Sequence, residues 1–160
     1  MQVETIVKVR ELMTTAVIAF KPSDKVHQVA ETFSLNRISG APVIDDQRKV
    51  IGVISEADIM KLTATVPFPD IDPLNPFPIF SLTAYRKEVE KIPAEIETLF
   101  EGSVKDVMTK DPVTISPDDS VLDAARLMHK GDFNRIPVVD DEGELVGLIA
   151  RADIIGLFVQ

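Results

Sequence analysis

Apolar residues recur in this chain with the spacing of one helix face in two places. Two sets occupy positions i, i+3, i+4 and i+7: Val26, Val29, Ala30 and Phe33, and Val121, Ala124, Ala125 and Met128. This spacing predicts two helices, each buried along one side. Each set follows a proline and a cluster of helix-starting residues, Pro22-Ser23-Asp24 and Pro117-Asp118-Asp119, which predicts where the helices begin.

Short apolar runs on both sides of these helices predict strands. One run precedes each helix, Val17–Phe20 and Val113–Ile115, and two follow it, Ala41–Ile44 with Val50–Ile54 and Ile136–Val139 with Leu145–Ile149. The polar segments between the paired runs, 45–49 and 140–144, favour hairpins. A last helix is expected to begin at Ser55 in one copy and at Ala150 in the other. The order strand, helix, strand, strand, helix therefore occurs twice, which predicts an α/β fold of the α+β type.

The two halves are copies of each other. Residues 9–63 align with 104–158 without a gap at a constant offset of 95, and 17 of the 55 aligned positions are identical. A copy of this size is marginal for burying enough apolar surface alone. We therefore expect two pseudo-symmetric repeats, 9–63 and 104–158, packed as one module.

An insert, 64–103, separates the repeats and is long for a connection within a compact domain. Its first half contains prolines at 67, 69, 73, 76 and 78, which predicts an extended segment. From Ser81 to Glu101 the pattern predicts a helix with a break at Pro93. The insert is interpreted as a strap that packs over its own domain, with a docking surface for a partner or dimer mate as the alternative.

Composition narrows the classes of function. The net charge of -9 argues against an extended nucleic-acid surface, which needs basic residues. The chain has no cysteine and only two histidines, so thiolate chemistry is excluded and no metal site is expected. The first residues do not resemble a signal peptide, and no apolar run is long enough to span a membrane. We expect a cytoplasmic protein.

Three motifs occur in both copies in the same order, and together they resemble the CBS domain family. They are Arg10-Glu-Leu-Met-Thr14 and Lys105-Asp-Val-Met-Thr109, Ala41-Pro-Val-Ile-Asp45 and Ile136-Pro-Val-Val-Asp140, and Gly52-Val-Ile-Ser-Glu-Ala-Asp58 and Gly147-Leu-Ile-Ala-Arg-Ala-Asp153. The resemblance implies two repeats with two clefts between them. In the family these clefts often hold AMP, ADP, ATP or S-adenosylmethionine, and the modules commonly form homodimers.

The resemblance also implies ligand contacts. Residues after each Met-Thr pair would hold adenine, and residues around each strand proline would line the same cleft. The aspartate near the start of each last helix would accept hydrogen bonds from ribose hydroxyls, while Ser55 and Arg135 would contact phosphate. The expected ligand-binding residues are Thr14, Thr15, Ala16, Val17, Ser39, Gly40, Ala41, Pro42, Ser55, Asp58, Thr109, Lys110, Asp111, Pro112, Asn134, Arg135, Ile136, Pro137 and Asp153.

Two observations keep alternatives open. Ser55 followed by Asp58 also fits an ordinary helix N-cap with an acid in the first turn. The copies also differ, because Ala150 replaces Ser55 and Arg135 replaces Gly40. Since family members combine the aspartate of one repeat with the Met-Thr segment of the other, we expect one cleft with Ser55 and Asp58 and another with Arg135 and Asp153.

The sequence therefore predicts a regulatory module that senses an adenine nucleotide or related adenosyl compound, requires no cofactor and reports to an unknown protein. The alternative is a protein-interaction or dimerisation module with non-functional clefts. An enzyme related to IMP dehydrogenase would need a cysteine nucleophile and a barrel of about 250 residues, and the chain has neither. We expect no catalysis, no membrane contact and no nucleic-acid partner.

Overall fold

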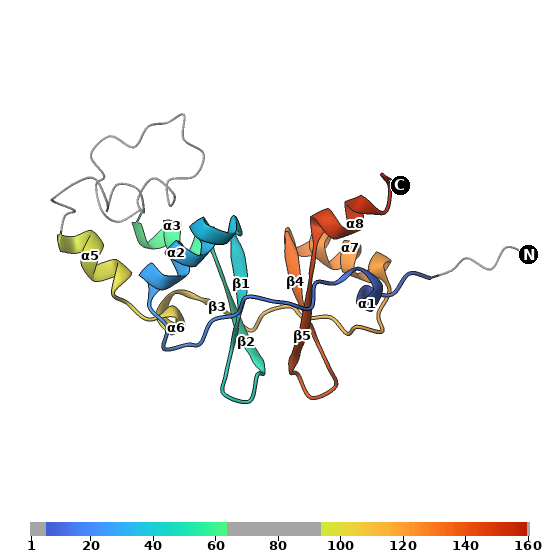
Figure 1. The fold of residues 1–160 in the computed structure, drawn as a ribbon, viewed down its shortest axis with the longest axis horizontal. Coiled ribbons are helices and arrows are strands. Elements are labelled where there is room, and N and C mark those ends of the chain that lie inside the picture. Colours follow the sequence, from blue (N-terminus) through green and yellow to red (C-terminus); the bar gives the residue numbers. More distant parts are fainter. Residues whose placement is uncertain (1–5, 64–93, 160) are drawn as a thin grey trace, which may run out of the picture. The chain divides into compact units, whose positions relative to one another are not determined.

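The computed structural model describes residues 6–63 and 94–159, and in both copies a helix, a hairpin and a second helix follow one another. In the first copy these elements are α2 (Val26–Asn36), β1 (Gly40–Ile44), β2 (Val50–Ser55) and α3 (Glu56–Thr63) (Figure 1). In the second they are α7 (Val121–Gly131), β4 (Arg135–Val139), β5 (Leu145–Ala150) and α8 (Arg151–Gly156). Each hairpin strand is one residue longer than predicted. The predicted fold class is confirmed.

The strands predicted before α2 and α7 are present only as single parallel bridges, Phe20 with Val43 and Ile115 with Val138. Phe20 and Ile115 donate their N–H groups to the carbonyls of Pro42 and Pro137 at 3.0 and 3.1 Å. The next rung of each ladder would need an N–H from that proline, and proline has none. The strand prediction was therefore wrong for residues 17–19 and 113–114.

Four further short elements lie outside the helix–hairpin–helix copies: α1 (Val9–Leu12), α5 (Ala94–Phe100), α6 (Val104–Val107) and β3 (Thr109–Lys110). Helix α5 matches the part of the predicted insert helix that follows Pro93. The proline-rich segment and the first part of that helix lie outside the described residues. Helices α1 and α6 precede the two Met-Thr pairs and were not predicted, because four residues are too few to show helical periodicity.

The chain divides into two compact units that interleave the repeats. Unit 1 consists of Met1–Ala19, Ile44–Ile51 and Asp111–Gln160, and unit 2 consists of Phe20–Val43 and Gly52–Lys110. In unit 1, the N–H of Val9 in α1 donates to Asp119 in the turn before α7, at 2.9 Å. In unit 2, the N–H of Val104 in α6 donates to Asp24 before α2, at 2.8 Å. Each unit thus joins one repeat to the short helix and Met-Thr pair of the other.

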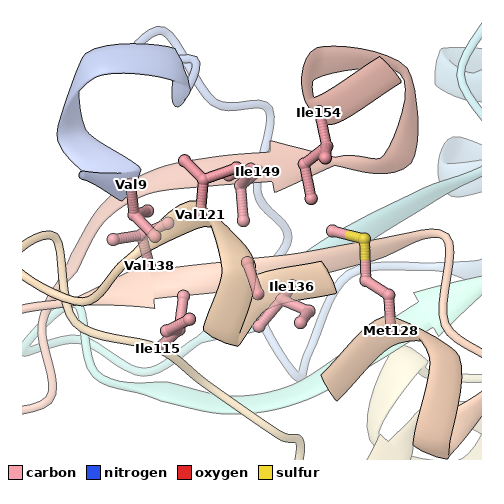
Figure 2. Packing of buried hydrophobic residues seen from close by; sticks show 9 residues of the cluster. Val9, Ile115, Val121, Met128, Ile136, Val138, Ile149 and Ile154 are labelled. Atoms are coloured by element: carbon pink, nitrogen blue, oxygen red, sulfur yellow. The ribbon is translucent and has the colours of Figure 1, made fainter. Parts of the chain in front are cut away.

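The core of unit 1 is a cluster of buried apolar side chains from α1, α7, β4, β5 and α8. Figure 2 shows Val9, Val121, Ile149 and Ile154 pointing toward a common interior. The nine members of the cluster are Val9, Ile115, Val121, Ala124, Met128, Ile136, Val138, Ile149 and Ile154.

Each member has a counterpart at the offset of 95 that is buried in unit 2. These counterparts are Val104, Phe20, Val26, Val29, Phe33, Ala41, Val43, Ile54 and Ile59. The duplicated sequence therefore produces a duplicated core. Among the described residues, no helix is long and apolar enough to cross a membrane.

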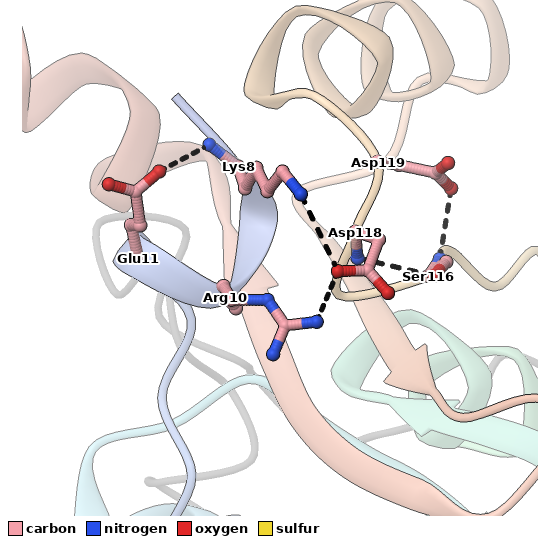
Figure 3. Close-up of polar contacts among 6 residues, drawn as sticks. All are labelled: Lys8, Arg10, Glu11, Ser116, Asp118 and Asp119. Atoms are coloured by element: carbon pink, nitrogen blue, oxygen red, sulfur yellow. Dashed lines mark hydrogen bonds and ion pairs between the residues drawn. The ribbon is translucent and has the colours of Figure 1, made fainter. Parts of the chain in front are cut away.

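Charged side chains also attach α1 to the turn before α7 in unit 1. Asp118 accepts a hydrogen bond from Arg10, and the Lys8 ammonium lies 3.8 Å from the same carboxylate (Figure 3). The hydrogen bond from Arg10 lowers the pKa of Asp118 below its ordinary value of 3.8, although the group is exposed. Ser23 occupies the equivalent position in the first repeat, so this contact belongs to unit 1 alone.

We expect the Asp118→Asn variant to be less stable than the wild type at neutral pH, with a difference that disappears in acid. A depressed folded-state pKa gives a stabilisation that is present above the ordinary pKa and is lost as pH falls through the folded value. Urea unfolding of both proteins at pH 7 and at several values below 3.8 measures this difference. Asp141→Asn is the control, because exposed Asp141 has no ion pair among the described residues. A difference that persists in the most acidic samples would contradict the ion-pair explanation.

Candidate functional site

In unit 2, the carboxylate of Asp58 lies at the start of α3 and accepts three hydrogen bonds. The N–H and hydroxyl of Ser55 donate to Oδ2 at 2.9 and 3.1 Å, and the Thr109 hydroxyl donates to Oδ1 at 3.0 Å. Asp58 is 8% exposed. The Asp58 N–H also donates to the Ser55 hydroxyl at 3.4 Å, so the helix-cap geometry expected from the sequence is present. We call Ser39, Gly40, Ser55, Asp58, Thr109 and Lys110 the Asp58 site.

Strand pairing brings the Met-Thr segment of the second repeat to this position. In β3, Thr109 pairs with Val53 and Lys110 pairs with Gly52, both in β2. A side chain at position 52 would obstruct this pairing, because a Cβ there would lie 2.7 Å from Met108 Sδ and 3.0 Å from the Thr109 carbonyl oxygen. Glycine at residue 52 thus favours close approach of the two segments, since any other residue would require Met108 to move and would crowd the Thr109 carbonyl.

The equivalent arrangement occurs in unit 1 with the repeats exchanged. Thr14 and Leu148 exchange two backbone hydrogen bonds of 2.9 Å, and a Cβ at Gly147 would lie 2.6 Å from Met13 Sδ. The Ala150 N–H donates to Asp153 Oδ2 at 2.8 Å. Arg135 is paired in register with Ala150, across the hairpin of β4 and β5. We call Thr14, Thr15, Asn134, Arg135, Ala150 and Asp153 the Asp153 site.

The two sites differ in charge as well as in hydrogen bonding. Arg135 and Arg151 occupy positions where the first repeat has Gly40 and Glu56. Arg151 is exposed, its N–H donates to the Asn134 carbonyl at 2.8 Å, and its guanidinium donates to the Phe133 carbonyl at 3.2 Å. Sequence reasoning did not include Arg151, although its replacement of an acid at the same position in the other copy was a visible signal.

The remaining expected ligand-binding residues are distributed over both units. Unit 2 contains Ala41 and Pro42, whereas unit 1 contains Ala16, Val17, Asp111, Pro112, Ile136 and Pro137. The side chains of Ala41, Pro42, Ile136 and Pro137 are buried. These four residues could therefore meet a ligand only through the main chain. The Thr109–Pro112 segment divides between the units after Lys110.

Both sites contain groups that could bind a ligand with vicinal hydroxyls. Within residues 6–63 and 94–159, no group of three or more histidine, aspartate or glutamate side chains could hold a metal ion. Each site instead offers a carboxylate and main-chain groups, with a hydroxyl on the neighbouring Met-Thr segment. Carboxylates form strong, charge-assisted hydrogen bonds with hydroxyl groups, which is the interaction that a sugar diol would require.

A family model described as CBS domain matches residues 9–64 and 104–160. The chain is 34% identical over 153 residues to the uncharacterized protein MJ1426 of Methanocaldococcus jannaschii. This match covers 94% of the chain and 90% of that protein. The chain is 31% identical over 148 residues to the chloroplastic CBS domain-containing protein CBSX2 of Arabidopsis thaliana. That match covers 88% of this chain but 58% of the length of CBSX2.

The fold is similar to a solved structure of CBSX2 in complex with AMP. The TM-score is 0.71 at 26% identity, over 96% of this chain and 97% of the solved one. The chain is also 29% identical to inosine-5'-monophosphate dehydrogenase of Methanocaldococcus jannaschii, over 96% of this chain but only 24% of that enzyme. The similarity to the enzyme thus covers a minor part of it.

Proposed function

Because the chain belongs to the CBS domain family, we propose that it is a regulatory module that binds an adenine nucleotide or a related adenosyl compound. The observation that supports this most strongly is the exchange of Met-Thr segments between the repeats. In unit 2 the Thr109 hydroxyl of the second repeat donates to Asp58 of the first. In unit 1 Thr14 of the first repeat pairs with Leu148, in the strand that leads to Asp153 of the second. The crystallised complex of CBSX2 with AMP supports the same class of ligand.

Of the two sites, the Asp153 site has the chemistry that a nucleotide needs. Its carboxylate would accept hydrogen bonds from the ribose hydroxyls, which are charge-assisted and about twice as strong as neutral ones. Arg135 of this site and the adjacent Arg151, the first residue of α8, would offer planar, bidentate donors to a phosphate. The first repeat has Gly40 and Glu56 at the positions of those arginines, and the cation of the Asp58 site is Lys110, which lacks the bidentate fork of an arginine. We therefore expect phosphate-bearing ligands to prefer the Asp153 site.

We further propose that the module does not turn the nucleotide over. The sequence has no cysteine and no Gly-rich phosphate loop ending in Gly-Lys. The similarity to inosine-5'-monophosphate dehydrogenase covers 24% of that enzyme, and a catalytic barrel alone would need more residues than this whole chain. A role in sensing is the simpler interpretation of the two sites.

A second candidate function is protein interaction or dimerisation without a ligand. Exposed apolar side chains in and after α8 favour it: Ile155, Phe158 and Val159 are 54%, 81% and 79% exposed. Large exposed apolar side chains that lie together commonly mark interaction surfaces. A homodimer is compatible with both candidates, so the two are distinguished by ligand binding and not by the oligomeric state.

We expect AMP, ADP, ATP or S-adenosylmethionine to raise the melting temperature of the chain. A ligand that binds only the folded state stabilises it, by about 2.7 kcal/mol at a hundred times its Kd. Differential scanning fluorimetry with these four compounds measures the shift, and GMP is the control for nonspecific anion binding. If no adenosine compound shifts the melting temperature while light scattering shows a dimer, the interaction module is the better account.

A further inference from the structure

The two aspartates of the candidate sites differ in how many hydrogen bonds they already accept. Both carboxylate oxygens of Asp58 are occupied: Oδ2 by the N–H and hydroxyl of Ser55, and Oδ1 by the Thr109 hydroxyl at 3.0 Å. The residue is also buried, at 8% exposure. Oδ1 could accept a second hydrogen bond, but because Asp58 is buried, an incoming hydroxyl group would compete with the Thr109 hydroxyl for access to this oxygen.

Asp153 is less occupied and less buried. The Ala150 N–H donates to Oδ2 at 2.8 Å, and within the described chain no other hydrogen bond reaches this carboxylate. Ala150 has no hydroxyl to match that of Ser55. Thr14 and its counterpart Thr109 are both exposed, but the Thr14 side chain has no hydrogen bond to a described residue. Oδ1 of Asp153 is thus available to a ligand.

We propose that the Thr109 hydroxyl closes the Asp58 site by taking the carboxylate oxygen that a ribose hydroxyl would use. This inference rests on the proposed function and assigns Thr109 the role of setting how many adenosine ligands the chain binds. A ligand at the Asp58 site must compete with the hydrogen bond between Thr109 and Asp58. Hydrogen bonds to charged groups are among the stronger ones in proteins, so this competition should weaken binding there by about ten-fold or more.

The test is calorimetric titration of AMP into the full chain and its variants. We expect about one equivalent of AMP for the wild type and two for Thr109→Val, which keeps the β-branched shape but lacks the hydroxyl donor. Thr109→Ser retains the hydroxyl and should remain at one equivalent. Thr14→Val, the same substitution at the matched position, should not add a second equivalent. The double variant Thr109→Val/Asp58→Asn should return to one.

Two results would overturn the inference. One is an unchanged stoichiometry and affinity in Thr109→Val, and the other is two equal sites in the wild type. Both leave the proposed function intact, whereas no AMP binding by any of the proteins would contradict that function and this inference together. Thr109→Ala removes the same hydroxyl with a smaller side chain and repeats the test if Thr109→Val does not fold.

Discussion

Replacing Asp153 by alanine is expected to weaken AMP binding by about ten- to hundred-fold. A hydrogen bond to a charged group is worth about 1.5–3 kcal/mol, and each ~1.4 kcal/mol is a factor of ten in Kd. The expected loss follows from the available Oδ1 oxygen of Asp153, which would accept from a ribose hydroxyl. Calorimetric titration of the variant with AMP measures it. Asp58→Ala is the matched control, because it removes the same side chain from the other repeat and should affect this binding far less.

Substitution of Arg135 tests the phosphate contact separately from the ribose contact made by Asp153. Arg135→Ala should weaken AMP binding by about ten-fold or more, through loss of a charge-assisted contact. The affinity for adenosine, which has no phosphate, should change little. Equal losses from Asp58→Ala and Asp153→Ala, with none from Arg135→Ala, would contradict the assignment of AMP to the Asp153 site with Arg135 on its phosphate.

The largest expected effect on stability is that of Phe33→Ala, which should lower the free energy of unfolding by about 3–5 kcal/mol. Phe33 is fully buried in unit 2 and meets Phe20 edge to face, with ring centroids 6.0 Å apart at 70°. Removing the ring loses this contact and leaves a cavity that the surrounding side chains can fill only in part. Urea unfolding followed by circular dichroism measures the change.

Leu35→Ala provides the control on the same helix, since Leu35 is 76% exposed. A surface substitution of this kind should change the free energy of unfolding by less than about 0.5 kcal/mol. Equal effects of the two substitutions would contradict the assignment of the buried face of α2.

The helices and hairpins could be predicted from the sequence because their signals are local. The apolar spacing of α2 and α7 and the polar turns between the hairpin strands lie within a few residues of each other. Because the repeats align at a constant offset of 95, each element was predicted independently from two segments of the sequence. The strands wrongly predicted before α2 and α7 also have a local explanation, because Pro42 and Pro137 lack the N–H donors that would extend the ladders.

The interleaving of the repeats depends on contacts between distant residues, which no local pattern encodes. Only the family resemblance suggested that each aspartate faces the other repeat's Met-Thr segment. The hydrogen bond from Thr109 to Asp58 joins residues 51 positions apart and could not be predicted from the sequence. The differences between Ser55 and Ala150, and between Gly40 and Arg135, were visible in the alignment of the copies. Their consequence for the carboxylates needed the structure.

We expect an adenosine ligand to bind where the Met-Thr segment of one repeat meets the aspartate of the other. The most direct measurement is the change in backbone amide NMR shifts of the isotope-labelled chain on addition of AMP. The largest changes are expected at Thr14–Val17, at Arg135 and from Ala150 to Asp153, and all of them should saturate with a single affinity. Unchanged shifts at these residues, with or without changes near the exposed Phe158, would contradict this expectation.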